Sequence, residues 1–346
     1  MMTFTIAIPV RNGAQFLEQA IKSAVEQSRA ADEILVVDDA STDCTASIAQ
    51  DARWAGRVRY VYNERPTGWA DAFNRAARMS EGDWIVLLSA DDLLDRDCLL
   101  HIEKGLQQFP AAAHCYVGYR YIDKDGRETK ASPGPHSLIP KLLPGRDYAY
   151  SYLESSANGA AIHRFLGGAT KRDLWVNACP VRKEAGLIGD NDFFLRIGAL
   201  TDVVAIDYPL ASVRYHFGSV TASLESLNHR LAEDYVFQVR EHATEKHLSP
   251  EVARLMIALA SRHVDGLLIE SFRRLRPEYL ARASELREEI TRLTGGESQG
   301  SRDIVAHVIS GSLAADRTGL IRGTLRGLAK LKTIIAMRQR VASPAN

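Results

Sequence analysis

The sequence predicts an α/β fold, in which a mixed, mostly parallel sheet is flanked by helices and followed by a helical C-terminal region. Three observations carry this prediction. Strand and helix patterns alternate from Met2 to residue 108, which is typical of a parallel sheet with crossover helices. Residues 84–88, Trp-Ile-Val-Leu-Leu, form a short apolar run, as expected for a strand with both faces covered. From Leu224 onward the apolar residues recur at helical spacing.

The first third of the chain supplies the alternating elements. A strand is expected at residues 4–9, and the turn at 11–13 contains Asn12, the predicted N-cap of the next helix. That helix has an apolar face that includes Phe16, Leu17 and Ile21. The same alternation predicts strands at 33–38, 57–62 and 84–88 and helices at 44–52, 69–79 and 95–108.

The middle of the chain is less regular. A strand is predicted at 115–122, and Asp123–Gly126 has the composition of a hairpin turn. Residues 132–159 are rich in Pro, Gly, Ser and Tyr, and we expect an irregular segment of a length that is usually functional or disordered. The pattern then predicts a short helix at 171–177, an amphipathic helix after the acidic loop 186–192, and strands at 203–206 and 210–216.

The last third predicts helices only, at 227–242, 250–275, 277–293 and from 303 to the end. We therefore expect an α/β domain at residues 1–223 and a helical region at 224–346. Residues 317–346 contain seven Lys or Arg and no acid, and their apolar residues fall on one helical face. Such a helix either lies on a membrane surface or packs on the protein with a charged rim, and both interpretations stay open.

Composition excludes several classes. The formal net charge is zero, so nothing indicates a nucleic-acid partner. No apolar run approaches the roughly eighteen residues of a membrane span, and the N-terminus lacks the layout of a signal peptide. The four cysteines are scattered without metal-ligand spacing, as free thiols in a reducing compartment are. We expect a cytoplasmic protein, peripheral at the inner face of the membrane if residues 317–346 bind lipid.

Carboxylates follow the predicted strands where those strands end. Asp38 and Asp39 follow one strand, Asp91 and Asp92 follow another, and Asp190 begins a later helix. The carboxyl ends of parallel strands meet at one edge of a sheet, where ligands bind. Oxygen ligands there suit Mg²⁺ or Mn²⁺ on a diphosphate. On the residues alone, the same acids could equally begin helices, where negative charge suits the helix dipole.

Other α/β enzymes fit this pattern poorly. The first turn, Val-Arg-Asn-Gly, lacks the glycine pattern of a dinucleotide-binding fold, and no Gly-Lys-Ser/Thr loop of a P-loop enzyme is present. A phosphorelay receiver has one early acidic pair, whereas this chain has a second pair after a later strand. A nucleotidyltransferase would need a Gly-rich, Lys-containing first loop, which residues 10–15 do not offer.

Five motifs in register resemble the family 2 glycosyltransferases of the GT-A fold, which is Rossmann-like, and the likeness extends to the spore-coat-type nucleotide-diphospho-sugar transferases. The order and spacing match to about residue 220, and the helical C-terminal third lies outside the resemblance. The motifs are Ile8-Pro-Val-Arg-Asn-Gly13, Ile34-Leu-Val-Val-Asp-Asp-Ala-Ser-Thr-Asp43, Gly68 with Ala72-Phe-Asn74-Arg-Ala76, Leu87-Leu-Ser-Ala-Asp-Asp92 and Gly189-Asp-Asn-Asp-Phe-Phe-Leu-Arg196.

The resemblance implies a pocket for a nucleotide-diphospho-sugar. Within it, Asp39 would accept a hydrogen bond from the N–H of a uracil or thymine ring, and Asp91 would face the ribose. The segment from Gly68 to Asn74 would lie beside the base and ribose. The complete set of implied binding residues is Pro9, Arg11, Asn12, Asp39, Gly68, Asn74 and Asp91.

The resemblance also implies a metal site and a general base. Asp92 would hold Mg²⁺ or Mn²⁺ on the diphosphate, with His216 as a further ligand or, equally, a structural histidine. Asp190 would deprotonate the acceptor hydroxyl. Two departures are visible: Ser89 stands where many members have Asp, and Gly189 stands where many have Glu.

The implied activity is that of a metal-dependent, inverting glycosyltransferase acting in cell-surface polysaccharide or glycoconjugate synthesis. The donor would be a UDP- or dTDP-sugar, and the acceptor a carbohydrate or a lipid-linked molecule bound between residues 132–165 and the Asp190 loop. A nucleotide-binding protein without catalysis is the alternative. The helical region could also pair two chains. Aromatic candidates for contacting sugar, or equally for the core, are Trp175, His163, Tyr148, Tyr150 and Tyr152.

Overall fold

The computed structural model describes residues 2–131, 136–157, 162–163, 165–216, 228–242, 249–273 and 277–294. The chain up to Leu293 forms one compact unit. The domain boundary expected at residue 223 and the basic segment 317–346 lie outside the described residues.

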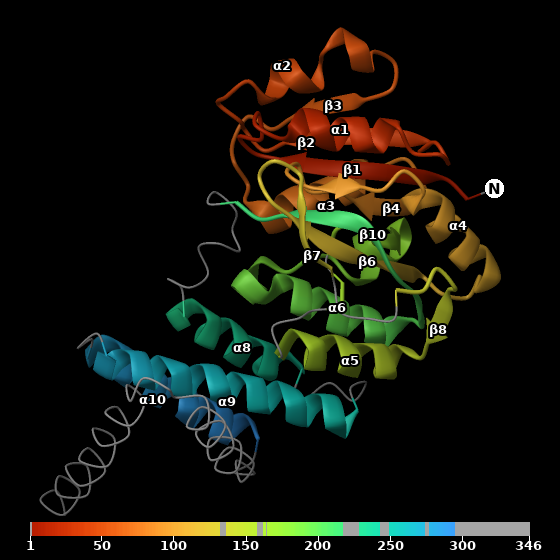
Figure 1. Cartoon of the computed structure of the whole chain (residues 1–346). Coiled ribbons are helices and arrows are strands. Elements are labelled where there is room, and N and C mark those ends of the chain that lie inside the picture. Colours follow the sequence, from red (N-terminus) through yellow and green to blue (C-terminus); the bar gives the residue numbers. More distant parts are fainter. Residues whose placement is uncertain are drawn as a thin grey trace, which may run out of the picture. The chain divides into compact units, whose positions relative to one another are not determined.

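One mixed sheet forms the centre of this unit, and it confirms the predicted fold class (Figure 1). Four strands from the first third of the chain pair in parallel, in the order β3-β2-β1-β4. Their pairing is parallel because a helix or helical turn returns the chain to the same end of the sheet before each new strand begins. These strands are β1 (Phe4–Val10), β2 (Glu33–Asp38), β3 (Arg59–Tyr62) and β4 (Trp84–Leu87).

The rest of the sheet continues from β4 in the order β9-β6-β10-β5, with β7 on β6 and β8 on β10. Strand β9 pairs antiparallel with both β4 and β6, which makes the sheet mixed. The β6–β7 pair is the hairpin predicted around Asp123–Gly126. These strands are β5 (Leu93–Leu94), β6 (His114–Ile122), β7 (Glu128–Ala131), β8 (Lys141–Leu143), β9 (Ala169–Lys171) and β10 (Val203–Arg214).

Strand β10 corrects the prediction of two separate strands at 203–206 and 210–216. It is one strand whose register against β6 shifts on both sides of Pro209. Proline has no N–H to donate to the ladder, so an irregularity at this position keeps the strand continuous. The strand ends at Arg214, and this end reaches the edge where the acidic residues gather.

Helices cover both faces of the sheet. Alternating residues of β1 show the division, because Ile6 and Ile8 pack in one core cluster and Ala7 in another. The first cluster includes α1 (Leu17–Val25), α2 (Thr45–Ala49) and α4 (Cys98–Gln108). The second includes α3 (Trp69–Met79), α5 (Gly145–Ala157) and α6 (Gly189–Leu200). Short helical turns lie at η1 (Ala52–Trp54), η2 (Leu174–Ala178) and η3 (Lys183–Ile188).

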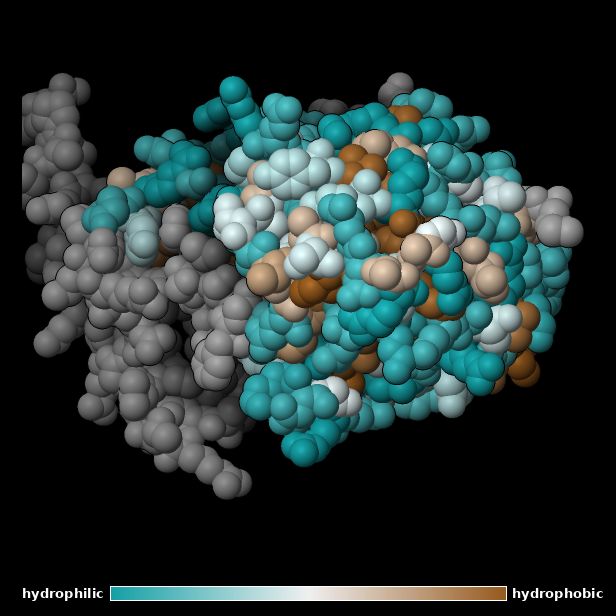
Figure 2. Space-filling model, turned by 90° about the horizontal axis from the view of Figure 1, so that it is seen from above, coloured by the Kyte–Doolittle hydropathy of each residue, from teal (hydrophilic) through white to brown (hydrophobic). Residues whose placement is uncertain are grey.

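The C-terminal helices form a further layer on α5 and α6 (Figure 1). They are α8 (Asn228–His242), α9 (Pro250–Arg273) and α10 (Pro277–Leu293), close to the predicted ranges. Leu153 of α5 and Leu195 of α6 share an apolar cluster with Val236 of α8. Among the described residues, no helix is long and apolar enough to cross a membrane. Seen from above, the described surface is mostly hydrophilic, with hydrophobic residues in small separate patches (Figure 2).

One local prediction was wrong. Helix α5 occupies part of the segment 132–159 that was expected to be irregular, because Tyr148 and Tyr152 lie one turn apart and are fully buried. The short helix predicted at 171–177 is confirmed: Lys171 ends strand β9, and residues 172–178 are helical, including the turn η2.

Candidate functional site

The loops after β1 and β2 are joined to each other at the carboxyl edge of the sheet. Asn12 Oδ1 accepts from the backbone N–H of Thr42 at 2.8 Å, and the N–H of Asn12 donates to Ser41 Oγ at 2.8 Å. Asn12 has a left-handed backbone with φ of 52°. It is therefore a link between loops and not the predicted N-cap, since α1 begins only at Leu17.

The same edge contains the other residues expected in the first loop. Pro9 is buried within β1, opposite Val37 of β2, whereas Arg11 is exposed. Gly13 lies against the loop after β4: a Cβ atom on Gly13 would come within 3.3 Å of the Cβ of Ala90. Three strand-end loops thus meet, as the sequence predicted for parallel strands.

Asp39 organises the loop that leads into α3. Its Oδ1 accepts from Asn63 Nδ2 at 2.9 Å and from Thr67 Oγ1 at 2.8 Å, and its Oδ2 accepts from the N–H of Gly68 at 3.0 Å. Burial alone would raise the pKa of Asp39, but these hydrogen bonds outweigh it and hold the pKa below its usual value. The carboxylate is thus ionised and fixed by the loop. Its contact with a nucleobase stays a prediction.

The acidic pair after β4 is divided between two environments. Asp92 is 6% exposed, and its Oδ1 accepts from the N–H of Arg214 at 2.7 Å. Burial and then the neighbouring charge of Asp91 raise the pKa of Asp92 well above its usual value. Asp91 is more accessible, and its Oδ2 lies 3.1 Å from His216 Nε2. His216 therefore stands beside Asp91, whereas the sequence had grouped it with Asp92.

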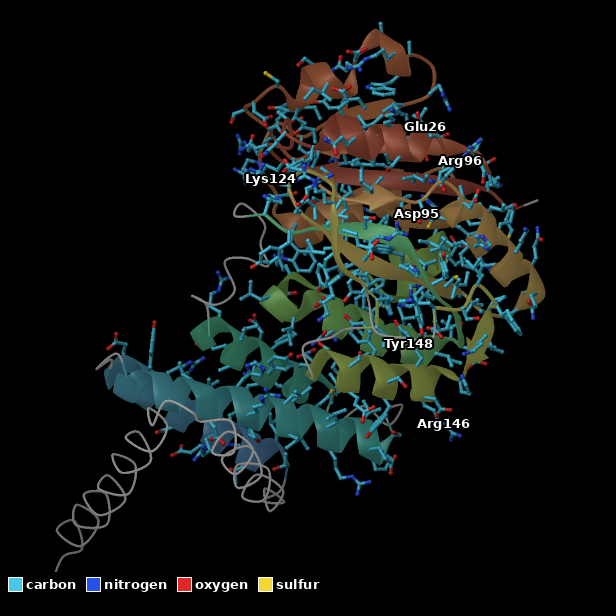
Figure 3. The ribbon with its side chains drawn as sticks, in the orientation of Figure 1. Glu26, Asp95, Arg96, Lys124, Arg146 and Tyr148 are labelled. Carbon is cyan, nitrogen blue, oxygen red and sulfur yellow. The ribbon has the colours of Figure 1, made fainter. Side chains whose placement is uncertain are left out.

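Arg214 joins this acidic pair to its surroundings. Its Nε donates to the carbonyl of Asp91 at 2.8 Å, and its Nη1 donates to the carbonyl of Lys124 at 3.1 Å, in the hairpin turn labelled in Figure 3. Its Nη2 donates to Gln19 Oε1 at 2.8 Å, and the guanidinium lies 4.5 Å from the ring centroid of Phe16. The hydrogen bonds of Arg214 thus fix the loop that contains Asp91 and the β6–β7 hairpin. Arg214 is therefore a positioning residue.

A cavity of about 790 Å³ is lined in part by Gln19. Its walls include Gln19 of α1, Glu26 directly after α1 and Arg96 after β5, and Figure 3 labels Glu26 and Arg96. None of the residues expected to bind the nucleotide or the metal lines this cavity. The candidate site is therefore built from the strand-end loops and not from this hollow.

The pair Asp91–His216 is compatible with a divalent cation. Neighbouring ligand atoms around an octahedral ion with bonds near 2.1 Å are about 3.0 Å apart, close to the 3.1 Å between these two atoms. Burial and the charge of Asp91 both disfavour ionisation of Asp92, and a cation beside the pair would offset that repulsion. In the described part of the chain, no three His, Cys, Asp or Glu side chains converge as a complete metal site.

Asp190 lies in the first turn of α6 and is half-buried. Its Oδ1 accepts from the N–H of Asn191 at 2.9 Å, and Asn191 Nδ2 donates to Tyr235 Oη of α8 at 3.3 Å. Burial, followed by the charge of Asp190, raises the pKa of Tyr235 to about 12. The neutral hydroxyl of Tyr235, from C-terminal helix α8, thus lies near the expected general base. The sequence did not predict this neighbour.

Asp192, two residues further, is fully buried in an ion network. Its carboxylate accepts from Arg182 at 2.6 and 3.0 Å and from Arg196 at 2.9 and 3.0 Å. His242 Nε2 of α8 lies 3.0 Å from Asp192 Oδ1. Burial opposes ionisation, but His242 and the two arginines outweigh it and hold the pKa of Asp192 well below its usual value. This carboxylate is structural.

Asn74 has a different role from the nucleotide contact that the resemblance implied. It is buried, its Nδ2 donates to the carbonyl of Val181 at 2.7 Å, and its Oδ1 accepts from the N–H of Val181 at 2.8 Å. Trp175 Nε1 also donates to this oxygen at 3.2 Å. Asn74 thus ties α3 to the segment that leads to Asp190.

Most of the aromatic candidates for sugar contact belong to the core. Tyr148, Tyr152 and His163 are fully buried, and Trp175 is 2% exposed. His163 Nε2 lies 2.8 Å from the Tyr148 hydroxyl, so these groups satisfy each other. Tyr150 is the exposed member of the set, on the outer side of α5.

Comparison with solved structures shows the fold, which is the GT-A fold predicted from the sequence. The fold is similar to S. aureus TarS 1–349 in complex with UDP-GlcNAc, with a TM-score of 0.63 and 14% identity over 85% of this chain and 84% of TarS. It is also similar to the mannosyltransferase PcManGT of Pyrobaculum calidifontis, in complex with GDP-Man and Mn²⁺. The TM-score is 0.52, with 21% identity over 95% of this chain and 86% of PcManGT.

Residues 5–165 match the model of glycosyl transferase family 2. The resemblance stated from the sequence is thereby confirmed. TuaG of Bacillus subtilis, named as a teichuronic acid biosynthesis glycosyltransferase, is 31% identical over 125 residues, which are 35% of this chain and 48% of TuaG. The chain thus spans about half of the length of this relative.

Proposed function

We propose that this protein is an inverting glycosyltransferase that transfers a sugar from a nucleotide-diphospho-sugar to an acceptor hydroxyl. One observation carries the proposal: the start of α3, directly after the loop fixed by Asp39, packs against the first turn of α6, which contains Asp190. Trp69 is the first residue of α3 and follows Gly68, and its ring lies against Gly189. A donor-side loop and a half-buried carboxylate are therefore held side by side, as transfer between two substrates requires.

The strand-end loops would hold the nucleotide. The exposed guanidinium of Arg11 supplies positive charge for phosphate oxygens. The family match supports this use of the site. A UDP- or dTDP-sugar is the expected donor, because the resemblance assigns Asp39 to a pyrimidine N–H. TarS and PcManGT have been solved with UDP-GlcNAc and GDP-Man respectively, so relatives of this fold take donors with different bases.

Mg²⁺ or Mn²⁺ would be held by Asp91 and His216, with Asp92 buried beside them. We favour Asp91 over Asp92, the principal carboxylate expected from the sequence, because Asp91 is more accessible and lies 3.1 Å from His216. When bound, the cation would offset negative charge on the leaving diphosphate. Arg214 would keep both acids in place through its hydrogen bonds to Asp92 Oδ1 and to the carbonyl of Asp91.

Asp190 would act as general base. It would take the proton of the acceptor hydroxyl while that oxygen forms a bond to the anomeric carbon and the bond from this carbon to the diphosphate breaks. Attack from the face opposite the diphosphate inverts the anomeric configuration. A positioned base typically contributes about 10²–10⁴-fold to the rate. The network of Asp192, Arg182 and His242 holds the helix that carries Asp190.

The acceptor is expected to be a carbohydrate or a lipid-linked molecule of cell-surface polysaccharide or glycoconjugate synthesis, in line with the name of TuaG. Peripheral membrane contact through residues 317–346 and pairing of chains through the C-terminal region stay predictions from the sequence. Deleting residues 317–346 and measuring co-sedimentation with anionic liposomes tests the membrane contact, and unchanged partition would dismiss it.

Calorimetry with UDP, dTDP and GDP, each with and without Mn²⁺, tests the proposed donor, and a donor-hydrolysis assay over the matching sugars tests turnover. We expect Mn²⁺-dependent binding of at least one pyrimidine diphosphate, together with turnover of its sugar derivative. Binding without turnover across the whole panel would support the alternative, a nucleotide-binding protein without catalysis.

A further inference from the structure

Trp69 differs from the other tryptophans of the chain. It is 40% exposed, whereas Trp54, Trp84 and Trp175 are 8%, 6% and 2% exposed. The indole at the first position of α3 keeps part of its face accessible, and tryptophan is enriched at interfaces where one part of the side chain is packed and another is open. The position of this ring therefore requires an explanation.

The ring of Trp69 fills the space that a side chain at residue 189 would occupy. A Cβ atom on Gly189 would lie 2.4 Å from Cη2 and 2.7 Å from Cζ2 of the indole. A Cβ there would push the indole aside, so this position of the ring depends on the glycine. This accounts for the glycine before Asp190, where the resemblance leads one to expect Glu. The space beside the expected base holds an aromatic ring in place of a second carboxylate.

Neighbouring contacts fix the orientation of this ring. Phe73, one helical turn along α3, meets it edge to face, with ring centroids 5.4 Å apart and an interplanar angle of 85°. Phe73 in turn meets Phe165 at 5.4 Å and 90°. The preceding residue Gly68 donates its N–H to Asp39, which fixes the backbone at the start of α3. The indole is thus held by Phe73 and Gly189 while part of its surface stays accessible.

We propose that Trp69 is a stacking platform for the pyranose ring of the acceptor and so selects carbohydrate acceptors beside Asp190. This inference rests on the proposed function. A pyranose ring presents C–H groups on its faces, and these pack against the negative face of an indole. The contact of Trp69 with Gly189 places the platform next to the group that would take the acceptor proton. The acceptor sugar is therefore favoured over the donor sugar.

Calorimetry with defined saccharides tests the platform directly. The probes are cellopentaose, maltopentaose and penta-N-acetylchitopentaose, each titrated into wild-type protein saturated with UDP and Mn²⁺. For the saccharide that binds best, Trp69→Ala should raise Kd at least about tenfold, equivalent to about 1.4 kcal/mol. Trp69→Phe keeps an aromatic face and should stay within about threefold of wild type. Leu200→Ala is the matched control, because Leu200 is 51% exposed at the far end of α6, about 15 Å from Asp190.

Intrinsic fluorescence supplies a second readout. Saccharide binding should change the emission of wild type and of Trp54→Phe equally, since Trp54 is buried on α2 and η1, and should leave the emission of Trp69→Phe unchanged. Saccharide Kd values of Trp69→Ala within about twofold of wild type would overturn the platform, as would the absence of a Trp69-dependent signal with all three probes. An effect confined to donor KM would also overturn it, because the ring would then serve the donor.

The two proposals fail separately. Saccharide binding that depends on Trp69 without turnover of any donor would contradict the glycosyltransferase activity and leave the platform standing. Transfer activity with the same acceptor KM in Trp69→Ala and wild type would support the glycosyltransferase activity and contradict the platform. Thermal melts of each variant, matched to wild type within a few degrees, show that a loss of binding is local.

Discussion

Replacing Asp192 with asparagine tests how the C-terminal helices support the candidate base. Asparagine has almost the same shape but no charge, so the variant leaves Arg182, Arg196 and His242 facing a neutral amide. These three groups come from the segment before α6, from α6 itself and from α8. The loss of the Asp192 charge should therefore loosen the packing of α8 on α6. Asp192 is only two residues from Asp190, so the candidate base should be affected.

The expected magnitude follows from burial. Removing one partner of a buried ion pair typically destabilises by about 3–5 kcal/mol. The Asp192 side chain is 0% exposed, but those of Arg182 and Arg196 are 24% and 11% exposed and keep some hydration. We therefore expect the lower end, about 3 kcal/mol, which corresponds to a fall in Tm of roughly 5 °C for a unit of 293 residues.

Thermal and urea unfolding followed by circular dichroism measure this change. Asp190→Asn is the matched control, in the same helix and half-buried, and should lower stability by at most about 1 kcal/mol. Because the folded-state pKa of Asp192 is depressed, its contribution is present above the ordinary pKa of 3.8 and lost as pH falls below it. The difference between wild type and Asp192→Asn should thus shrink toward pH 3. Equal stability of the two variants at pH 7 would refute the structural role.

Three further predictions concern the metal, the pH response and the loop. His216→Ala should raise the Mn²⁺ concentration for half-maximal turnover at least tenfold, because the cation loses a ligand beside Asp91. An unchanged metal requirement would exclude His216 as a metal ligand. Burial raises the pKa of Asp234 to about 6, so its charge weakens the fold as pH rises from about 4 through 6. At pH 7.5, Asp234→Asn should therefore have a higher Tm than wild type, and at pH 4 the two should have the same Tm. The asparagine can still accept the hydrogen bond from the N–H of Leu187. The same Tm difference at both pH values would contradict this prediction. Gly68 has φ of 89° and ψ of 162°, a backbone conformation that a residue with a Cβ atom adopts only with strain. Gly68→Ala should therefore lower the free energy of unfolding by about 1–3 kcal/mol and raise donor KM. A Tm equal to that of wild type would rule out this strain.

The parts of the fold that could be predicted are those with local periodicity. Strands β1 to β4 and helices α8 to α10 appear within a few residues of their expected ranges, because each has a continuous apolar pattern. Strands β5, β8 and β9 contain only two or three residues, and their pairing depends on partners far along the chain. Helix α5 was missed because its buried tyrosines resemble a polar, irregular segment in composition.

In the candidate site, too, local features could be predicted and contacts between distant residues could not. The acids were found because they stand where strand patterns end, as Asp39 and Asp91 do. Which of two adjacent acids faces His216 depends on the path of the loop backbone, and no sequence pattern records it. The partners of Asp192 are 10 and 50 residues away, at Arg182 and His242, so only the folded chain brings them together.

Single-turnover transfer by Asp190→Asn is the most direct test of the central claim, that this chain is a glycosyltransferase with Asp190 as its base. Wild type and variant are compared at saturating donor and Mn²⁺, after calorimetry has shown equal nucleotide affinity and melts have shown an equal Tm. The predicted result is a rate lower by about 10²–10⁴-fold in the variant, with the donor still bound. A variant that transfers sugar as fast as wild type would contradict the assignment of the base.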